Sequence, residues 1–300
     1  MLDDLWSRWL ASGRDGGDAN AKARVNAQTS TYATKLLDAL PLAPGAALLD
    51  IGSGEGLVGF AALAHAPGLH VTFTDLSAPL LAKCEVRAQI LGFAGQCGFV
   101  ACSAARLAVP SASQDAITAR SALAYEAHKP AAFAEMLRVL RPGGRFSIAE
   151  PLFREEALAA AAMRARLAVT PDPNLALLHR WKAAQYPDTP ETIAAHPLTN
   201  YDERELLRMA QAAGFEALQM ELHISLKPAP PRQWVAFLET SPHPLAPSLG
   251  ALLKTHYSTA EAIMLERALR PFIEAGGTPQ TQRMIYLSGA KPLSSSSSSS

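Results

Sequence analysis

The chain of 300 residues is poor in cysteine, has no excess charge of either sign and contains no long apolar run. Its three cysteines, Cys84, Cys97 and Cys102, form no CxxC pair and show no Cys/His ligand spacing, so we predict buried free thiols and no metal site. Lysine plus arginine and aspartate plus glutamate both number 27. Because a protein that follows phosphates usually carries a basic excess, no nucleic-acid partner is predicted.

No stretch reaches the roughly 18 uninterrupted apolar residues of a membrane-spanning helix, and the first ten residues lack the pattern of a signal peptide. We therefore expect a cytoplasmic protein with no membrane partner. Hydrophobic residues make up 49% of the chain and charged residues 18%, which suits a large packed core with a smaller lid. The tail Ser294–Ser300 has nothing apolar to bury and is predicted to be disordered.

Short apolar strands alternate with helices in the middle of the chain. Such alternation indicates βαβ units in a parallel sheet that is buried on both faces. The first five expected strands are Ala47–Ile51, His70–Thr74, Gly98–Cys102, Ala116–Ala119 and Arg145–Ala149. The helices expected among them are Leu57–His65, Pro79–Leu91 and Pro130–Leu140.

Two helical blocks lie outside this minimal plan, at Phe153–Pro197 and Arg232–Ala275. Between them we predict an amphipathic helix at Tyr201–Gly214 and a strand at Glu216–Leu226, and a last strand at Arg283–Gly289. The resulting sheet has seven strands, with added helices at the N-terminus, after strand five and between strands six and seven. Additions at the carboxyl edge of such a sheet are where a substrate pocket would be walled.

A glycine-rich loop follows the first expected strand, in the sequence LLDIGSGEG that ends at Gly56. Gly52 and Gly54 lack a Cβ, so the chain can turn tightly and let a ligand approach the backbone at a helix N-terminus. Asp75 ends the second strand, where a carboxylate can accept both hydroxyls of a ribose. A structural turn or a nicotinamide dinucleotide site would show a similar loop.

Together with Asp75 and the segment LRVLRPGGR at Leu137–Arg145, this loop resembles those of the class I S-adenosylmethionine (SAM)-dependent methyltransferases. The likeness is greatest to the small-molecule type, which includes quinone-ring and arsenite methyltransferases. It implies an α/β fold with a Rossmann-like, mostly parallel seven-stranded sheet, helices on both faces and helical lid segments. It also implies SAM as the cofactor.

The expected organisation has a SAM-binding core interrupted by helical additions. The segments are an N-terminal helical lid at 1–35, the core at 36–151, a helical insertion at 152–200, a core continuation at 201–230, a second helical insertion at 231–280, the last core strand at 281–292 and the serine tail at 293–300.

The resemblance also assigns cofactor-binding roles to particular residues. The methionine side of SAM would lie along the glycine loop, the ribose on the carboxylate that ends strand two, and the adenine beside the residues that follow strands two and three. The residues are Asp50, Gly52, Ser53, Gly54, Asp75, Leu76, Ser103, Ala104 and, near the sulfonium, Arg120.

Candidate catalytic residues follow strands four and five: Arg120, Tyr125, His128 and Glu150. His128 could be a base or an exposed loop histidine. Glu150 could bind a polar group of the substrate or cap the following helix. Arg120 could anchor a substrate carboxylate, pair with a nearby glutamate or hold the carboxylate of SAM.

Two pairs of residues near the N-terminus are candidates for a lid. Trp6 and Trp9, at helical spacing, could close over the cofactor or anchor their helix on the core. Arg14 and Tyr32, in the entry region rich in glycine and aspartate, are candidates of similar strength for the same role.

The predicted function is methyl transfer from SAM to an oxygen or nitrogen of a small-molecule acceptor by in-line displacement. No NPPY-like tetrapeptide follows strand four, which argues against methylation of exocyclic amines in nucleic acid. A SAM-binding partner or sensor without catalytic activity is the alternative. An NAD(P)-dependent oxidoreductase is disfavoured because the loop reads GxGxG and not GxGxxG. A monomer and a homodimer both stay open.

Overall fold

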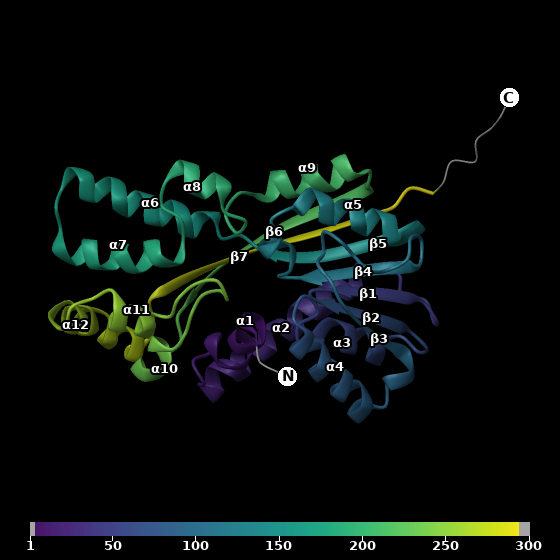
Figure 1. The fold of residues 1–300 in the computed structure, drawn as a ribbon, viewed down its shortest axis with the longest axis horizontal. Helices are drawn as coiled ribbons and strands as arrows, with labels where there is room; N and C mark the ends of the chain where they lie inside the picture. The colour runs from purple at the N-terminus through teal and green to yellow at the C-terminus, as the bar shows by residue number, and fades with distance from the viewer. Residues whose placement is uncertain (1–3, 294–300) are drawn as a thin grey trace.

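The protein is described by a computed structural model that covers residues 4–293, and the serine tail predicted to be disordered lies outside the described residues. A seven-stranded sheet has the order β3-β2-β1-β4-β5-β7-β6 (Figure 1). The strands are β1 (Ala47–Ile51), β2 (His70–Asp75), β3 (Cys97–Ala101), β4 (Gln114–Arg120), β5 (Leu140–Pro151), β6 (Glu216–Pro228) and β7 (Pro279–Ala290). Only the β5–β7 and β6–β7 pairings are antiparallel, so the predicted, mostly parallel α/β sheet is confirmed.

Helices cover both faces of the sheet, as expected. One face carries α2 (Ala19–Asp38), α3 (Leu57–His65) and α4 (Ala78–Leu91), whose apolar side chains pack on alternate residues of the strands. The other face carries α5 (Lys129–Val139) and α9 (Glu203–Ala213). Because β1 lies between these two layers, its Leu48 and Leu49 are both fully buried, on opposite faces.

The parallel register brings the carboxyl ends of β1, β2 and β4 to one edge of the sheet. Asp50 of β1 lies opposite Phe73 of β2 and Thr118 of β4. At the fifth strand the prediction began too late, since β5 begins at Leu140. The register between β4 and β5 shifts near its start, where the RPGG turn is accommodated.

Each of the two predicted helical blocks consists of three helices. The first contains α6 (Arg154–Val169), α7 (Pro173–Gln185) and α8 (Pro190–Ala195), and the second contains α10 (Trp234–Leu238), α11 (Leu249–Thr255) and α12 (Thr259–Ala275). Proline in the first turn of α7 and α8 fixes where these helices begin. Both blocks lie beyond the carboxyl edge of the parallel strands (Figure 1). In the described part of the chain, no helix combines the length and apolar character needed to cross a bilayer.

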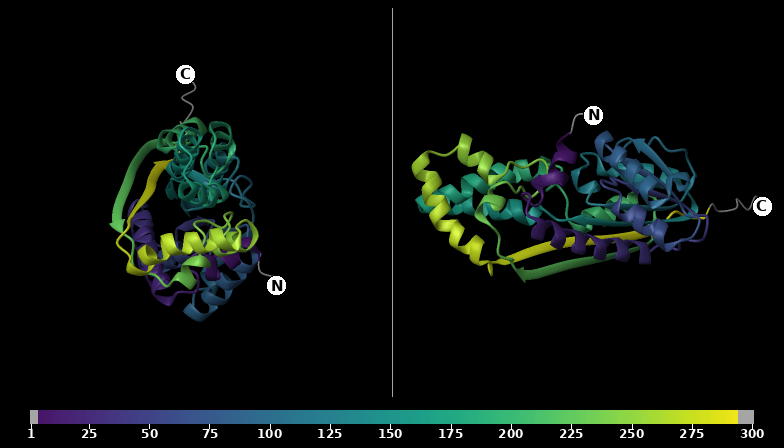
Figure 2. Two further views of the ribbon diagram at one scale, coloured as in Figure 1. Left: turned by 90° about the vertical axis from the view of Figure 1, so that its left-hand side faces the viewer. Right: turned by 90° about the horizontal axis from the view of Figure 1, so that it is seen from below.

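Strands β6 and β7 continue past the sheet as a two-stranded ribbon that leads to the second helical block (Figure 2). The ribbon and helix α2 run alongside each other, and Lys35 of α2 forms an ion pair with Glu221 of β6 at 2.9 Å. The ribbon therefore extends the core outward and holds α10, α11 and α12 in front of the sheet edge.

The N-terminal segment consists of α1 (Leu5–Arg8), a π-helical turn η1 (Trp9–Gly13) and the start of α2. It is attached to the second helical block. The indole Nε1 of Trp9 donates to the carbonyl of Ser241 at 3.2 Å, and the Ser241 N–H donates to the carbonyl of Gly13 at 2.9 Å. The Arg232 guanidinium donates to the carbonyl of Asp15 at 2.9 Å. Two parts of the chain that are far apart in sequence thus form one wall.

Lys129 connects the core to the chain that follows the first helical block. Only 1% of this side chain is exposed. Its Nζ donates to the carbonyl oxygens of Glu126 at 3.0 Å and Pro197 at 2.6 Å, and lies 4.5 Å from the centre of the Tyr201 ring. A buried ammonium with these acceptors holds the 197–201 segment against α5.

Replacing Lys129 with methionine is expected to lower the free energy of unfolding by about 2–4 kcal/mol, because the carbonyls of Glu126 and Pro197 would be left buried without a donor. Urea denaturation followed by circular dichroism measures the change. Lys83→Met, at an exposed position of α4, is the control and should change the stability by less than about 0.5 kcal/mol. Equal stability of Lys129→Met and wild type would contradict this role.

Candidate functional site

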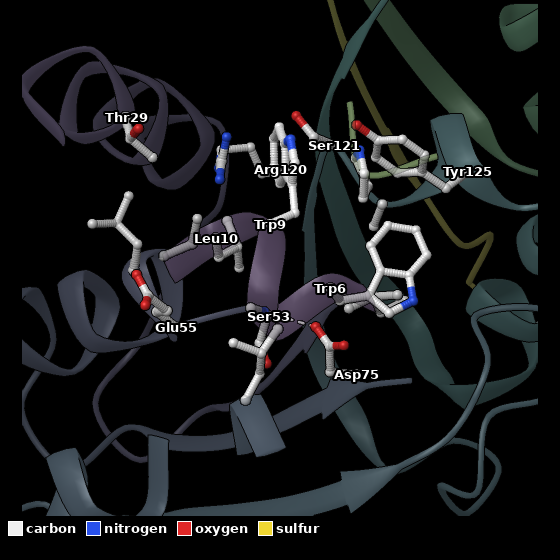
Figure 3. A pocket seen from close by; sticks show the side chains of 18 of the residues that line it. Trp6, Trp9, Leu10, Thr29, Ser53, Glu55, Asp75, Arg120, Ser121 and Tyr125 are labelled. Atoms are coloured by element: carbon white, nitrogen blue, oxygen red, sulfur yellow. Dashed lines mark hydrogen bonds between the residues drawn. The ribbon is translucent and has the colours of Figure 1, made fainter. Parts of the chain in front are cut away.

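A cavity of about 470 Å³ lies at the carboxyl edge of the parallel strands (Figure 3). Its walls come from the N-terminal segment, from α2, from the loops after β1, β2, β4 and β5, and from two prolines that precede α11. The volume falls in the range of small-molecule sites. The cavity lies where the sequence predicted a pocket to be walled.

The glycine loop after β1 forms the floor of this cavity. Gly52 and Gly54 have φ angles of +62° and +55°, which residues with a Cβ rarely adopt. A Cβ on Gly52 would also lie 2.4 Å from the Cβ of Ala122. Glycine at this position therefore lets the loop turn and lets the loop after β4 approach it.

Asp50 holds the glycine loop from beneath. Its side chain is 2% exposed; one oxygen accepts the Gly59 N–H at 3.0 Å and the other accepts the Thr118 hydroxyl at 3.1 Å. Burial raises the pKa of this carboxyl to about 7, although both hydrogen bonds lower it. Asp50 thus positions the loop, and both its oxygens are used within the protein.

Asp75, at the end of β2, faces the cavity. Its oxygens accept the N–H groups of Gly54 and Ser77, each at 2.8 Å, and burial raises its pKa. A carboxylate has about four acceptor positions, so each oxygen keeps one for a ligand. Such a pair of acceptors suits two neighbouring hydroxyl groups.

Only some of the residues predicted to lie beside the adenine line the cavity. Leu76 and Ala104 line the cavity. Ser103 does not, because its hydroxyl donates to Oε2 of Glu126 at 2.8 Å. The prediction of buried thiols is confirmed for Cys84 alone of the three cysteines, since Cys97 and Cys102 are half-buried and Cys102 lies in the cavity wall.

Glu150 lies behind the loop after β4. Its side chain is fully buried, and its oxygens accept the N–H groups of Ala122, Leu123 and Ala124 at 3.2, 3.1 and 2.9 Å. Glu150 is outside the cavity lining, so the structure does not bring it to a substrate. It caps the preceding turn, η3 (Leu123–Tyr125), so the prediction that it could cap the following helix is wrong.

The two other candidate catalytic residues differ in position, since Tyr125 lines the cavity and His128 does not. Tyr125, held by that turn, lines the cavity, and its ring meets the ring of Trp6 edge to face at a centroid distance of 5.1 Å. His128 is exposed, precedes α5 and does not line the cavity. The structure therefore favours the exposed-histidine alternative over a catalytic base.

Comparison with known proteins identifies the family. Residues 48–144 match the model described as "Methyltransferase domain". The chain is 31% identical to the ubiquinone/menaquinone biosynthesis C-methyltransferase UbiE of Stutzerimonas stutzeri, over 61% of this chain and 73% of that protein. It is also 31% identical to nocamycin O-methyltransferase of Saccharothrix syringae, over 65% of this chain and 68% of that protein. The chain belongs to the class I SAM-dependent methyltransferases.

Other alignments with relatives cover a smaller share of both chains. With UbiE of Methylobacterium nodulans the identity is 42%, over 33% of this chain and 39% of that protein. The chain thus spans under half the length of some of the relatives it matches. The YcgJ protein from Bacillus subtilis has a similar fold, with a TM-score of 0.53 and 17% identity over 90% of this chain and 99% of that structure.

The residues of the cavity fit SAM, the cofactor of the family. Asp75 keeps acceptors for a ribose, the glycine loop lines the cavity, and the buried Ser53 hydroxyl has no partner among the described residues. Such an unpaired buried hydroxyl is costly unless a ligand bonds to it. Figure 3 shows Ser53 and Asp75 on one side of the pocket, with Arg120, Ser121 and Tyr125 along the opposite side.

Another part of the cavity lining is aromatic and rich in proline. Both tryptophans of the N-terminal segment line it, as does Tyr32 of α2. The sequence did not single out the remaining members, because only the fold brings them to the cavity. These are Pro151, Phe153, Pro242 and Pro244.

The raised pKa of Asp50 makes stability depend on pH. The folded state binds the proton more tightly than the unfolded state, so this stability is present below about pH 4 and is lost as the pH rises toward 7. We expect the free energy of unfolding of wild type, minus that of Asp50→Asn, to fall by up to about 4 kcal/mol between pH 4 and pH 8. Urea denaturation at a series of pH values measures it; a difference that grows with pH would show that Asp50 is stabilised as an anion.

Proposed function

We propose that the protein transfers the methyl group of SAM to an oxygen or nitrogen of a small-molecule acceptor. The observation that carries this proposal is one continuous cavity, which joins the glycine loop and Asp75 to an aromatic wall containing Trp6, Tyr125 and Phe153. The first part suits the cofactor, and the second offers apolar surface for a second molecule.

The residues of the chain mainly align the two molecules and exclude water. Bound SAM supplies a methyl group already activated by its positively charged sulfur. Asp75 holds two hydroxyls of the cofactor, and the segment containing Trp6 and Trp9 covers the glycine loop, where Leu10 would lie 3.4 Å from a Cβ on Gly54. Alignment and exclusion of water supply most of what such a displacement requires.

Three lining groups that could take a proton from carbon, Tyr125, Cys102 and Glu126, are protonated or hydrogen-bonded within the protein, which favours oxygen or nitrogen as the methylated atom. None of its described lining residues is a histidine. Burial raises the pKa of both Tyr125 and Cys102, so these groups stay protonated near neutral pH. The oxygens of Glu126 accept from Ser103 and from the His128 N–H. An acceptor carbon must lose a proton, whereas an ionised oxygen or a nitrogen lone pair can attack unaided.

Calorimetric titration with S-adenosylhomocysteine tests the cofactor site. We expect wild type to bind it and Asp75→Ala to lose at least about tenfold in affinity, because two hydroxyl contacts would disappear. Asp38→Ala, at an exposed position of α2, is the control and should bind like wild type. NAD should not bind.

Absence of binding to wild type would contradict the proposal. Transfer of a labelled methyl group from SAM to a panel of hydroxylated and amino compounds then separates an enzyme from a SAM-binding partner or sensor. Binding without any transfer would favour the second function.

A further inference from the structure

Two arginines reach the cavity from opposite ends of the sequence. Arg14 follows η1 in the N-terminal segment, and Arg120 ends β4. Neither side chain has a hydrogen bond or ion pair within residues 4–293, and Nε of Arg14 is buried without a partner. Their charges are near enough that each affects the other.

Three other charged side chains at the cavity have hydrogen-bond partners within the protein. Asp50 and Asp75 accept hydrogen bonds on both oxygens, as described above. Arg87 donates to the carbonyl of Glu55 at 3.1 Å, and its guanidinium carbon lies 4.9 Å from the centre of the Phe60 ring. Arg14 and Arg120 are thus the arginines of the cavity lining that no hydrogen bond or ion pair of the described residues engages, although the carboxyls of Asp50 and Glu150 also act on the charge of Arg120.

Placing Arg14 and Arg120 together is energetically unfavourable, and no hydrogen bond or ion pair of either side chain offsets it. Burial lowers the pKa of Arg120 and repulsion from Arg14 lowers it further, whereas the nearby carboxyls of Asp50 and Glu150 raise it. A guanidinium nevertheless stays charged at neutral pH, so the repulsion and the desolvation persist in the free protein. An anion bound between the two would relieve both, and the planar fork of each side chain matches a carboxylate.

We propose that Arg14 and Arg120 form a subsite for a carboxylate carried by the methyl acceptor. This inference rests on the proposed function and narrows the acceptor to an apolar or aromatic carboxylic acid. The adjoining walls are apolar, with Trp6, Trp9 and Phe153 around the same cavity. The carboxylate serves as an anchor, and the remainder of the acceptor lies against these rings.

The positions of the two arginines favour the acceptor over the cofactor as the source of the carboxylate. Arg120 lies across the pocket from Ser53 and Asp75, on the side of Ser121 and Tyr125 (Figure 3). Arg14 belongs to the segment that is attached to the Ser241 region, outside the glycine loop.

The test uses the full chain saturated with S-adenosylhomocysteine. Benzoate, cinnamate and octanoate are titrated calorimetrically, each beside its neutral amide. We expect at least one carboxylate to bind wild type about tenfold more tightly than its amide, and this preference to disappear in Arg14→Gln and in Arg120→Gln. Arg106→Gln, which removes an exposed arginine outside the cavity, should keep the preference.

Affinity for S-adenosylhomocysteine separates the possible failures. Failure of wild type to bind it would overturn the proposed function itself. Normal binding by wild type with an equal loss in both arginine variants would assign the pair to the cofactor and overturn the inference. Equal or absent binding of carboxylates and amides would overturn it too.

The melting temperature without ligand distinguishes a binding arginine from an arginine that stabilises the fold. We expect Arg120→Gln to melt at or above the temperature of wild type, because a half-buried guanidinium without a hydrogen bond or ion pair is removed. A clearly lower melting temperature would show that Arg120 supports the fold, and would contradict the assignment.

Discussion

The buried carboxyl of Asp50 is the constraint on which the site depends. It connects β1 to the first turns of α3 through Gly59 and to β4 through Thr118. These two bonds fix the glycine loop between neighbouring strands, so Gly54 can donate to Asp75. The loop, the strand ends and the cavity above them therefore keep one geometry, and the cost is a carboxyl held away from water.

A second constraint closes the cavity from the opposite side. The β6–β7 ribbon carries α10, α11 and α12 outward, and the N-terminal segment attaches to that block through Trp9 and Ser241. The N-terminal segment is thus supported by chain more than 200 residues away in sequence.

The acidic groups near the cavity divide into two kinds. The carboxyl oxygens of Asp50 and Glu150 accept hydrogen bonds from backbone N–H groups, which are neutral donors, and so hold the backbone in place. Asp75 keeps free acceptors, and Arg14 and Arg120 keep free donors. Hydrogen-bond donors and acceptors that have no partner within the protein therefore indicate where a ligand would bind, whereas the type of residue alone does not.

The sequence by itself determined the elements of the parallel core, the positive-φ glycine loop and the position of Asp75, because these depend on local patterns of apolar residues and on glycine. It left open whether Glu150 and His128 meet a ligand, and it missed Phe153 in the cavity wall. Those outcomes depend on which strand ends, turns and distant loops meet in space. Only the tertiary structure decided them, since burial and hydrogen-bond partners come from contacts between segments far apart in the chain.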